Sequence, residues 1–384
     1  MQAEQAPASG AVQRHAIEFK ATGSEYFRIW IVNLLLIVLT LGLYLPWAKV
    51  RKLRYFYSNT WIAGDAFDFH GEPRKMLRGT LLAAAFLIVY SLGSRFSGWA
   101  ALAAALAFVV LWPALFRAAM RFRLANTGWR GLRLRFTGDV AGAYACLLPP
   151  LALALLPLTL VGALAPVAPG KPPAVPPLLS GFVALGMLVF MAAFPYFLWR
   201  VRRYQHGNFA IGGLQTRLDA DVGVIYGIFI KLIGIGFAAV LAVGVLVFLL
   251  VVAGRGGGAG SRFVWIALVP ALGMLLLNVL LRSYLQVRLQ NLIWSRTGNE
   301  VLRFKSTLQL AGYLGLQCKN YLLILLTLGL YWPFAVVHTR RAQFEAVELR
   351  TRIGLDEITQ VAGRENPSAA GEMAADLFGL DIGM

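Results

Sequence analysis

The sequence predicts an all-α membrane protein: a polytopic helical bundle of repeated helical hairpins, with six to eight apolar segments and short β-hairpin-like or extended cytoplasmic segments. Three observations predict it: an apolar composition, a series of long apolar segments, and a repeated residue pattern where those segments end. Of the 384 residues, 58% are hydrophobic and 14% are charged. Soluble proteins are about 45–50% apolar and about 25% charged, so a water-soluble enzyme, a coiled coil or a disordered chain fits poorly.

The apolar segments lie at 26–47, 79–94, 99–116, 143–165, 178–199, 223–252, 263–281 and 321–337. About 20 apolar residues are needed to cross a hydrocarbon core of about 30 Å, and most of the segments reach this length. The net charge of +18 then favours the lipid bilayer and its anionic head groups as partners. We predict no nucleic-acid partner, because no nucleic-acid fold signature accompanies the basic and aromatic residues.

The connections between the apolar segments fall into two kinds. Three are short: 95–98, the Pro-rich 166–177 and the Gly-rich 253–262, and together they hold four basic residues. Four are longer, at 48–78, 117–140, 200–222 and 282–320, and they hold 23 Lys and Arg residues. Because cytoplasmic loops collect Lys and Arg, the longer linkers are predicted to lie inside the cell and the short ones outside.

A residue pattern recurs where apolar segments end in proline. Two copies have identical spacing: Pro46, Arg54, Asn59, Gly64, Phe69 and Pro113, Arg121, Asn126, Gly131, Phe136. A third copy begins at Pro195, and two weaker copies follow. The periodicity predicts a duplicated unit of two apolar helices and a basic stretch. Hydrophobic and polar residues alternate around Asn59–Gly64 and Asn126–Gly131, which predicts short β-hairpins or extended ribbons.

The two ends of the chain share a second pattern. Residues 40–47 (TLGLYLPW) match residues 327–334 (TLGLYWPF), and Asn33 and Asn320 lie seven residues before them. The helical part of 26–39 would be roughly 21 Å long, too short to span. We therefore expect re-entrant hairpins at 26–47 and 321–337 that turn at Gly42 and Gly329; the alternative is that each spans once. Further structural or pathway candidates in these hairpins are Tyr44, Pro46, Tyr331 and Pro333.

Six spans then remain, and both termini are expected in the cytoplasm. The predicted organisation is a cytoplasmic N-terminal tail (1–25), one polytopic membrane domain (26–355) and a polar, disordered C-terminal tail (356–384). The membrane domain is expected to contain five hairpins, at 26–47, 79–116, 143–199, 223–281 and 321–337.

Catalytic and ligand-binding motifs are absent from the sequence. It has no HExxH, GxSxG, P-loop or GxGxxG motif, and its four histidines and two cysteines lack metal-ligand spacing. We therefore predict no enzyme activity, no cofactor and no metal site. Lys231 is the only ionisable side chain well inside an apolar segment, which makes it a functional candidate, although it could also extend to the membrane surface.

Three motifs between residues 19 and 71 carry a family resemblance: FKATGSEYF at 19–27, TLGLYLPW at 40–47, and the Arg54-Tyr55…Asn59-Thr60…Gly64…Phe67-x-Phe69-x-Gly71 pattern. Together they resemble the YjgN family of bacterial inner-membrane proteins. The resemblance covers about residues 19–355 and departs at the loops 166–177 and 253–262. It implies a multi-pass protein of the bacterial inner membrane, and it supplies no substrate, cofactor or catalytic residue.

Two functions from different classes are compatible with these features. The first is transporter- or channel-like passage of a small solute or lipid, because paired segments interrupted by Gly and Pro mark binding sites in transporters. The second is a non-enzymatic structural or adaptor protein whose basic cytoplasmic face binds anionic lipid or a protein partner.

Membrane topology gives the first testable prediction. Cysteines introduced at Ser97, Gly170 or Gly258 should react with an impermeant thiol reagent added outside intact cells, because the short loops carry few basic residues. A cysteine at Ser58 should be protected until the membrane is permeabilised. Labelling of the Ser58 cysteine in intact cells would contradict this topology.

Overall fold

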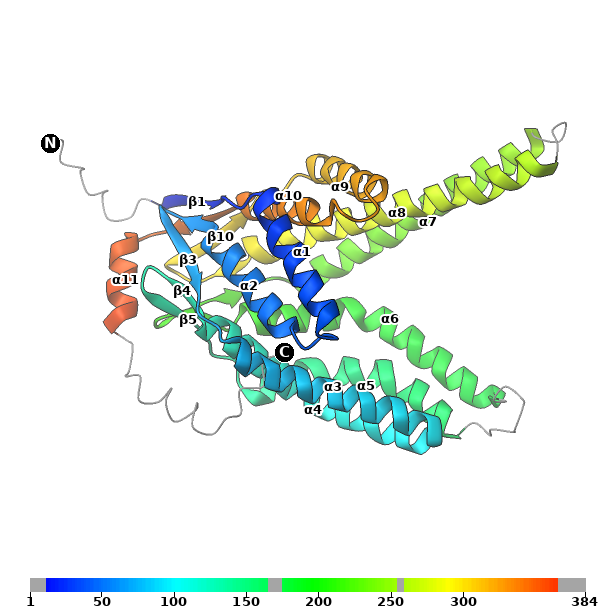
Figure 1. The fold of residues 1–384 in the computed structure, drawn as a ribbon, viewed down its shortest axis with the longest axis horizontal. Helices are drawn as coiled ribbons and strands as arrows, with labels where there is room; N and C mark the ends of the chain where they lie inside the picture. Colours follow the sequence, from blue (N-terminus) through cyan, green and yellow to red (C-terminus); the bar gives the residue numbers. More distant parts are fainter. Residues whose placement is uncertain (1–11, 165–174, 254–258, 365–384) are drawn as a thin grey trace.

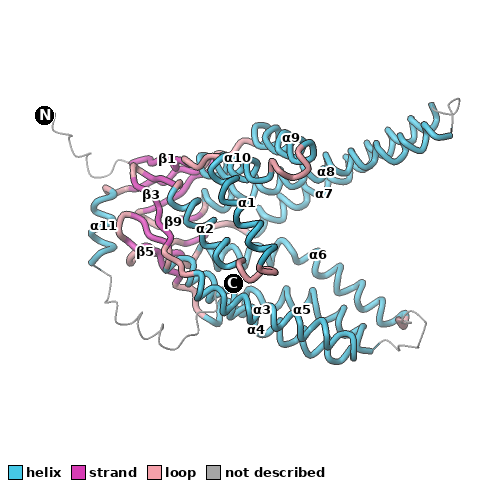
Figure 2. Tube along the Cα trace, viewed as in Figure 1, coloured by secondary structure: helices cyan, strands magenta, loops and turns pink. Residues whose placement is uncertain are grey.

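The protein combines membrane-length helices with one continuous β-sheet at their base. The computed structural model describes residues 12–164, 175–253 and 259–364. The chain is mostly helical, and the strands gather at one end while the long helices extend away from them (Figures 1 and 2). The predicted helical membrane protein is therefore confirmed in outline, but the all-α class is confirmed only in part, because the predicted extended segments pair with one another into one sheet through the described part of the chain.

The described elements follow one order five times: strand, helix, helix, strand. Unit 1 comprises β1 (Gln13–Phe19), α1 (Gly23–Leu39), α2 (Leu45–Ser58) and β2 (Thr60–Ile62). Unit 2 comprises β3 (Asp65–Phe69), α3 (Pro73–Phe96), α4 (Gly98–Ala125) and β4 (Thr127–Trp129). Unit 3 comprises β5 (Leu132–Phe136), α5 (Val140–Leu164), α6 (Pro177–His206) and β6 (Phe209–Ile211).

Units 4 and 5 follow the same order, except that the first strand of unit 4 is divided. Unit 4 comprises β7 (Leu214–Gln215), β8 (Arg217–Leu218), α7 (Val222–Ala253), α8 (Ala259–Ser295) and β9 (Thr297–Gly298). Unit 5 comprises β10 (Leu302–Ser306), α9 (Leu310–Leu326), α10 (Trp332–Glu345) and β11 (Val347–Thr351), and α11 (Leu355–Arg364) comes last.

The sheet closes on itself. Its strand order is β7-β6-β5-β4-β3-β2-β1-β11-β10-β9-β8, and all its described pairings are antiparallel. The two end strands, β7 and β8, are consecutive in the chain and are separated only by Thr216. At this break the Thr216 N–H donates to the Phe209 carbonyl at 2.8 Å, and its hydroxyl donates to the His206 carbonyl at 2.6 Å. The two halves of this divided strand pair with β6 and β9, so the sheet is nearly closed into a small barrel and has no long unpaired edge.

Strand β1 completes the barrel by joining the two ends of the chain. It pairs with β2 through Ile17 and Ile62, and with β11 through His15 and Leu349. The predicted N-terminal tail (1–25) therefore contains a central strand and the first turn of α1.

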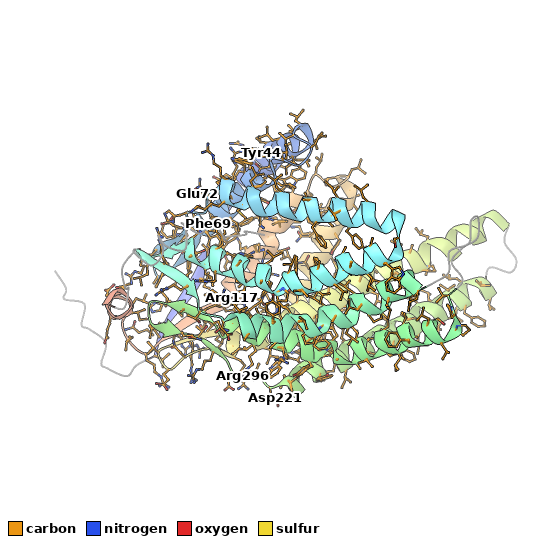
Figure 3. All side chains as sticks on the ribbon, turned by 90° about the horizontal axis from the view of Figure 1, so that it is seen from below. Tyr44, Phe69, Glu72, Arg117, Asp221 and Arg296 are labelled. Carbon is orange, nitrogen blue, oxygen red and sulfur yellow. The ribbon has the colours of Figure 1, made fainter. Side chains whose placement is uncertain are left out.

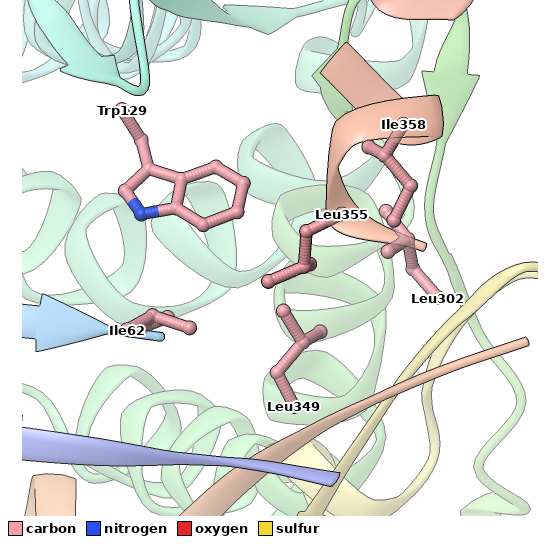
Figure 4. Packing of buried hydrophobic residues seen from close by; sticks show 6 residues of the cluster. All are labelled: Ile62, Trp129, Leu302, Leu349, Leu355 and Ile358. Carbon is pink, nitrogen blue, oxygen red and sulfur yellow. The ribbon is translucent and has the colours of Figure 1, made fainter. Parts of the chain in front are cut away.

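The barrel has an apolar interior that α11 covers (Figure 4). Buried side chains of four strands meet two from α11, forming the cluster Ile62, Trp129, Leu302, Leu349, Leu355 and Ile358. Arg130 adds ion pairs to Asp65 at 2.7 Å and to Asp356 at 3.1 Å. The prediction of a disordered tail from residue 356 is thus wrong for 356–364, where an amphipathic helix docks on the barrel; residues 365–384 lie outside the described part.

Tight turns join successive units. Gly64 (φ +84°) follows Ala63 (φ +52°), and Gly131 (φ +77°) follows Arg130 (φ +50°). Two consecutive residues with positive φ are typical of the two-residue type I′ hairpin turn. The strands expected around these turns are present, and along β5 the leucine and phenylalanine ends are buried whereas the two arginines are exposed.

Hydrogen bonds at the base of the helices have the same pattern in each unit. Within a unit, the N–H one residue after the first strand donates to the carbonyl before the last strand, at 2.8–3.0 Å. These five bonds are Lys20 to Asn59, His70 to Asn126, Thr137 to Asn208, Asp219 to Arg296, and Thr307 to Ala346. Each unit is therefore a closed loop of chain standing on two adjacent strands.

Side chains connect each unit to the next. In every case a side-chain N–H on the second helix of one unit donates a hydrogen bond to a backbone carbonyl of the following unit. This carbonyl lies two residues beyond the first strand of that unit. We call these hydrogen bonds the link bonds. They are Arg54 to Gly71 (3.4 Å), Arg117 to Gly138 (2.8 Å), Trp199 to Ala220 (2.7 Å), Asn291 to Leu308 (2.9 Å) and Arg341 to Ala21 (2.8 Å). The last bond closes the ring from unit 5 to unit 1.

Six helical segments in the described part of the chain are long and apolar enough to cross a membrane. They are Pro73–Gly93, Gly98–Ala125, Val140–Leu164, Pro177–His206, Val222–Val252 and Leu268–Ser295. They belong to units 2, 3 and 4, in agreement with the predicted number of spans.

The end hairpins are bent pairs of short helices, as predicted. In the first turn Leu41 and Gly42 have φ values of +48° and +91°, and in the second Leu328 and Gly329 have +49° and +94°. The threonine before each turn accepts from a backbone N–H four residues later, at 3.0 Å for Thr40 and 2.9 Å for Thr327. A single straight helix over 26–47 is therefore excluded. The two hairpins also contact each other, because α1 packs on α10.

The turn glycines give the second prediction. Gly42→Leu and Gly329→Leu should each lower the free energy of unfolding by about 1–2 kcal/mol, because a Cβ penalises positive φ by about that amount. Thermal unfolding of the detergent-solubilised protein measures the effect. The matched control is Gly315→Leu on α9, where a Cβ meets no atom within 4 Å and φ is not positive. Equal stability of Gly329→Leu and Gly315→Leu would contradict the requirement for glycine. Leucine at the loop glycine Gly257 should likewise leave stability unchanged, although Gly257 lies outside the described residues.

Candidate functional site

A large cleft lies between units 3 and 4, beside the break in the barrel wall. It measures about 1090 Å³ and lies between the first turns of α5, the last turns of α6, β7–β8, and the segment from the end of α8 to β10. Five arginines line it: Arg200, Arg203, Arg217, Arg296 and Arg303. We call this pocket the arginine cleft; Arg296 is labelled in Figure 3.

Aromatic residues hold the arginines of α6 in position. The Trp199 indole, fixed by its link bond to Ala220, lies 5.1 Å from the Arg203 guanidinium. The Arg200 guanidinium lies 5.8 Å from the Tyr196 ring and donates to its hydroxyl at 3.4 Å. Cation–π contacts orient a guanidinium without neutralising it. The donors of these arginines therefore stay available to a ligand.

The charge of the arginine cleft is not balanced internally. Two carboxylates, Asp219 and Glu300, also line it, but none of the five arginines forms an ion pair within the described part of the chain. Arginine presents a planar set of donors that matches carboxylate and phosphate groups. The arginine cleft is thus suited to an anion.

Apolar helices rise next to the arginine cleft. Helices α6 and α7 meet near their base, where Phe194 and Phe229 pack at 5.7 Å and the Tyr226 hydroxyl donates to the Ala192 carbonyl at 3.1 Å. Farther from the sheet the two helices diverge (Figure 1). No residue of the most apolar stretch of either helix is buried. The arginine cleft therefore adjoins a fork whose walls are exposed and apolar.

A second basic region lies on α2, α4 and α10. Burial lowers the pKa of Lys49, and the nearby Arg123 lowers it further. Burial and Arg340 lower the pKa of Lys52 in the same way. Like charges thus gather here from three helices.

The residues singled out from sequence lie in other places. Asn59 and Asn126 cap helices by donating to the Tyr55 and Phe122 carbonyls at 2.8 Å, and Gly64 and Gly131 form the hairpin turns. The aromatic and proline candidates of the end hairpins are structural: Tyr44 stacks on Trp47 and Tyr331 on Phe334, while Pro46 and Pro333 are buried at the start of α2 and α10. Lys231 lines a smaller pocket between α7 and α8.

Sequence reasoning missed the arginine cleft. Its arginines were counted within the basic linkers 200–222 and 282–320, where they indicated topology and nothing more. The alternation of arginine with Tyr196 and Trp199 along one helix was the available signal. Within the described residues, no group of three or more His, Cys, Asp or Glu side chains could hold a metal ion.

Asn33 and Asn320, which occupy matching places, differ in their contacts. Both are buried, at 7% and 2% exposure, and neither Oδ1 atom has a hydrogen-bond partner in the described part of the chain. The Asn320 amide donates to the Thr339 hydroxyl at 3.2 Å and to the Ala335 carbonyl at 3.4 Å. Asn320 thus bonds to one backbone carbonyl and one hydroxyl of α10, and no bond joins the two asparagines within the described residues.

The third prediction follows from this difference. Asn320→Leu should lower the free energy of unfolding by about 1–2 kcal/mol, since buried partners lose a donor. Asn33→Leu should be nearly neutral, because it removes an oxygen that already lacks a partner. Thermal unfolding of the two purified variants checks this. Equal destabilisation by both substitutions would show that the bonds of Asn320 contribute nothing.

Comparison with known proteins places this geometry in a family. Three matched relatives are each called "Inner membrane protein YjgN". The Salmonella typhimurium LT2 relative is 25% identical over 340 residues, 83% of this chain and 84% of the relative. The Escherichia coli O157:H7 relative is 30% identical over 135 residues, 35% of this chain and 34% of the relative. The Escherichia coli K12 relative is 45% identical over 58 residues, 15% of each chain.

The matched region thus spans about a third or less of the two Escherichia coli proteins and most of the Salmonella protein. No solved structure matches the chain. A family model described as "Bacterial protein of unknown function (DUF898)" matches residues 14–377, which cover all five units except Gln13 at the start of β1. The chain therefore belongs to the DUF898 family, whose matched relatives are the YjgN inner-membrane proteins.

Proposed function

We propose that this inner-membrane protein provides transporter- or channel-like passage for a small anionic solute or lipid. The observation that carries the proposal is the arginine cleft, an unbalanced set of guanidinium groups at the foot of two diverging apolar helices. An anion, or the head group of an amphiphile, would be held by the arginines while apolar parts lie along α6 and α7.

The route we propose runs beside the barrel. The barrel interior is filled by the apolar cluster and covered by α11, so an axial route would require displacing packed side chains. At the boundary of units 3 and 4 the arginine cleft already provides a cavity beside the barrel wall, between α6 and the end of α8.

The orientation and the origin of the fold belong to the same proposal. We place the sheet and both termini in the cytoplasm, since basic residues concentrate at the base of the helices. We infer that the five units arose by duplication, because the same backbone bonds and link bonds recur in each. The end hairpins, whose Leu41 and Leu328 tips are 95% and 94% exposed, would enter the bilayer to half depth.

The fourth prediction tests the passage of an anion. Purified protein in vesicles should conduct small anions or move fluorescent anionic lipid between leaflets. The double variant Arg200→Gln/Arg203→Gln should reduce that rate about tenfold or more, because each charged hydrogen bond contributes about 1.5–3 kcal/mol. Arg135→Gln, an exposed arginine on β5, is the matched control for charge loss.

Two outcomes would contradict the proposal: no passage of either probe by the wild-type protein, or equal rates for the double variant and the control. A structural or adaptor protein is the second candidate, and the same unpaired arginines favour it. Arginine-dependent binding of anionic vesicles with no passage would support that candidate.

A further inference from the structure

A smaller pocket lies between α7 and α8, on the other side of α7 from α6. It measures about 470 Å³ and is lined by one face of each helix, with Gly227 and Lys231 on α7 and Tyr284, Arg288 and Asn291 on α8. Lys231 lies nine residues into α7, roughly 14 Å from its start at about 1.5 Å per residue. The pocket therefore reaches from the sheet end into the apolar part of the hairpin.

Two cations share this pocket without a counter-ion. No carboxylate lines it, and Lys231 forms no hydrogen bond or ion pair with any described residue. Arg288 lies 5.6 Å from the Tyr284 ring and likewise has no ion pair in the described part of the chain. Lys231 lies within an apolar segment, where an ionised side chain is costly unless an opposite charge or water compensates it, and Arg288 adds a second positive charge from the base of α8. The pocket is therefore suited to bind an anion.

The pocket also has room for a ligand. A Cβ at Gly227 would meet no atom within 4 Å, so the glycine leaves an opening on the lining face of α7. Asn291 is not available, because its amide makes the link bond to Leu308 and its Oδ1 accepts from the Ser306 hydroxyl and the Leu308 N–H. Recognition therefore depends on Lys231 and Arg288.

The surroundings of Lys231 indicate what the anion is attached to. Ile230, Ile233 and Phe237 on α7 are 67%, 68% and 67% exposed. An acyl chain could cover them, which a free inorganic ion could not. Lysine and arginine together bind phosphate through charged hydrogen bonds, and basic pockets between helices bind phospholipid head groups.

We propose that the pocket between α7 and α8 binds a phosphate group through Lys231 and Arg288, and that a phospholipid of the adjacent leaflet supplies it. This lipid would compensate the two charges and support the hairpin of unit 4, whose first helix has no buried residue in its most apolar stretch. The proposal is independent of passage through the arginine cleft.

The fifth prediction uses the full-length protein, delipidated in detergent and titrated with phosphatidylglycerol, diacylglycerol or inorganic phosphate. Native mass spectrometry counts bound lipid, and thermal unfolding reports stabilisation. Phosphatidylglycerol should bind and raise the unfolding temperature, whereas diacylglycerol, which lacks phosphate, should not. Lys231→Gln and Arg288→Gln should each raise the half-saturating concentration about tenfold or more, while Arg282→Gln on α8 should leave it unchanged.

Two glycine substitutions test whether the lipid occupies the pocket while both cations stay in place. Gly227→Leu keeps both cations but fills the opening, so it should also abolish stabilisation by phosphatidylglycerol. Gly244→Leu on the same helix, where a Cβ also meets no atom within 4 Å, should not.

The outcomes distinguish the two sources of phosphate and the two proposals. Stabilisation by inorganic phosphate that depends on Lys231 and Arg288 would assign the site to a free phosphate. Equal effects of Lys231→Gln, Arg288→Gln and Arg282→Gln, or of diacylglycerol and phosphatidylglycerol, would overturn the proposal. Absence of anion passage in vesicles would leave this lipid site unaffected.

Discussion

The architecture depends on one constraint at the base of the helices. The backbone carbonyl two residues beyond the first strand of each unit needs a hydrogen-bond donor. A buried carbonyl without one would cost about 1–3 kcal/mol. In all five units the donor comes from the second helix of the preceding unit. Arginine, tryptophan and asparagine fill the role, so the requirement is for a donor and not for one residue. These bonds and the pairing of β1 with β11 join the units into a ring.

The ring fixes the helices at one end and leaves the other end to the bilayer. Barrel strands and link bonds lie at the base, whereas the apolar stretches of α6 and α7 bury no residue within the protein. Lipid must therefore provide much of the packing around these helices. This division explains why the sequences of these stretches are continuously apolar, with apolar side chains on all faces of the helix.

Several features were predictable because local sequence determines them. Gly42 and Gly329 marked turns with positive φ, Gly64 and Gly131 marked hairpins, and segment length gave the six spans. Barrel closure was not predictable, since β1 pairs with strands about 45 and 335 residues away and no local period records such a pairing. Helix α11 was missed because its polar face dominates its composition. The arginine cleft was missed because it is assembled from separate linkers.

The link bonds also explain where unpaired charge accumulates. Arg54 and Arg341, each eight residues after a buried proline, make the link bonds of units 1 and 5. Arg203 stands at the same distance from Pro195, but Trp199 makes that bond, so Arg203 is left to face the arginine cleft. In unit 4 Asn291 makes the link bond. Arg288 lines the pocket between α7 and α8, and Arg296 lines the arginine cleft. In units 3 and 4 the link bonds thus come from the neutral side chains Trp199 and Asn291, and arginines of the same helices line the two pockets; the divided strand of unit 4 lies at the boundary between these units.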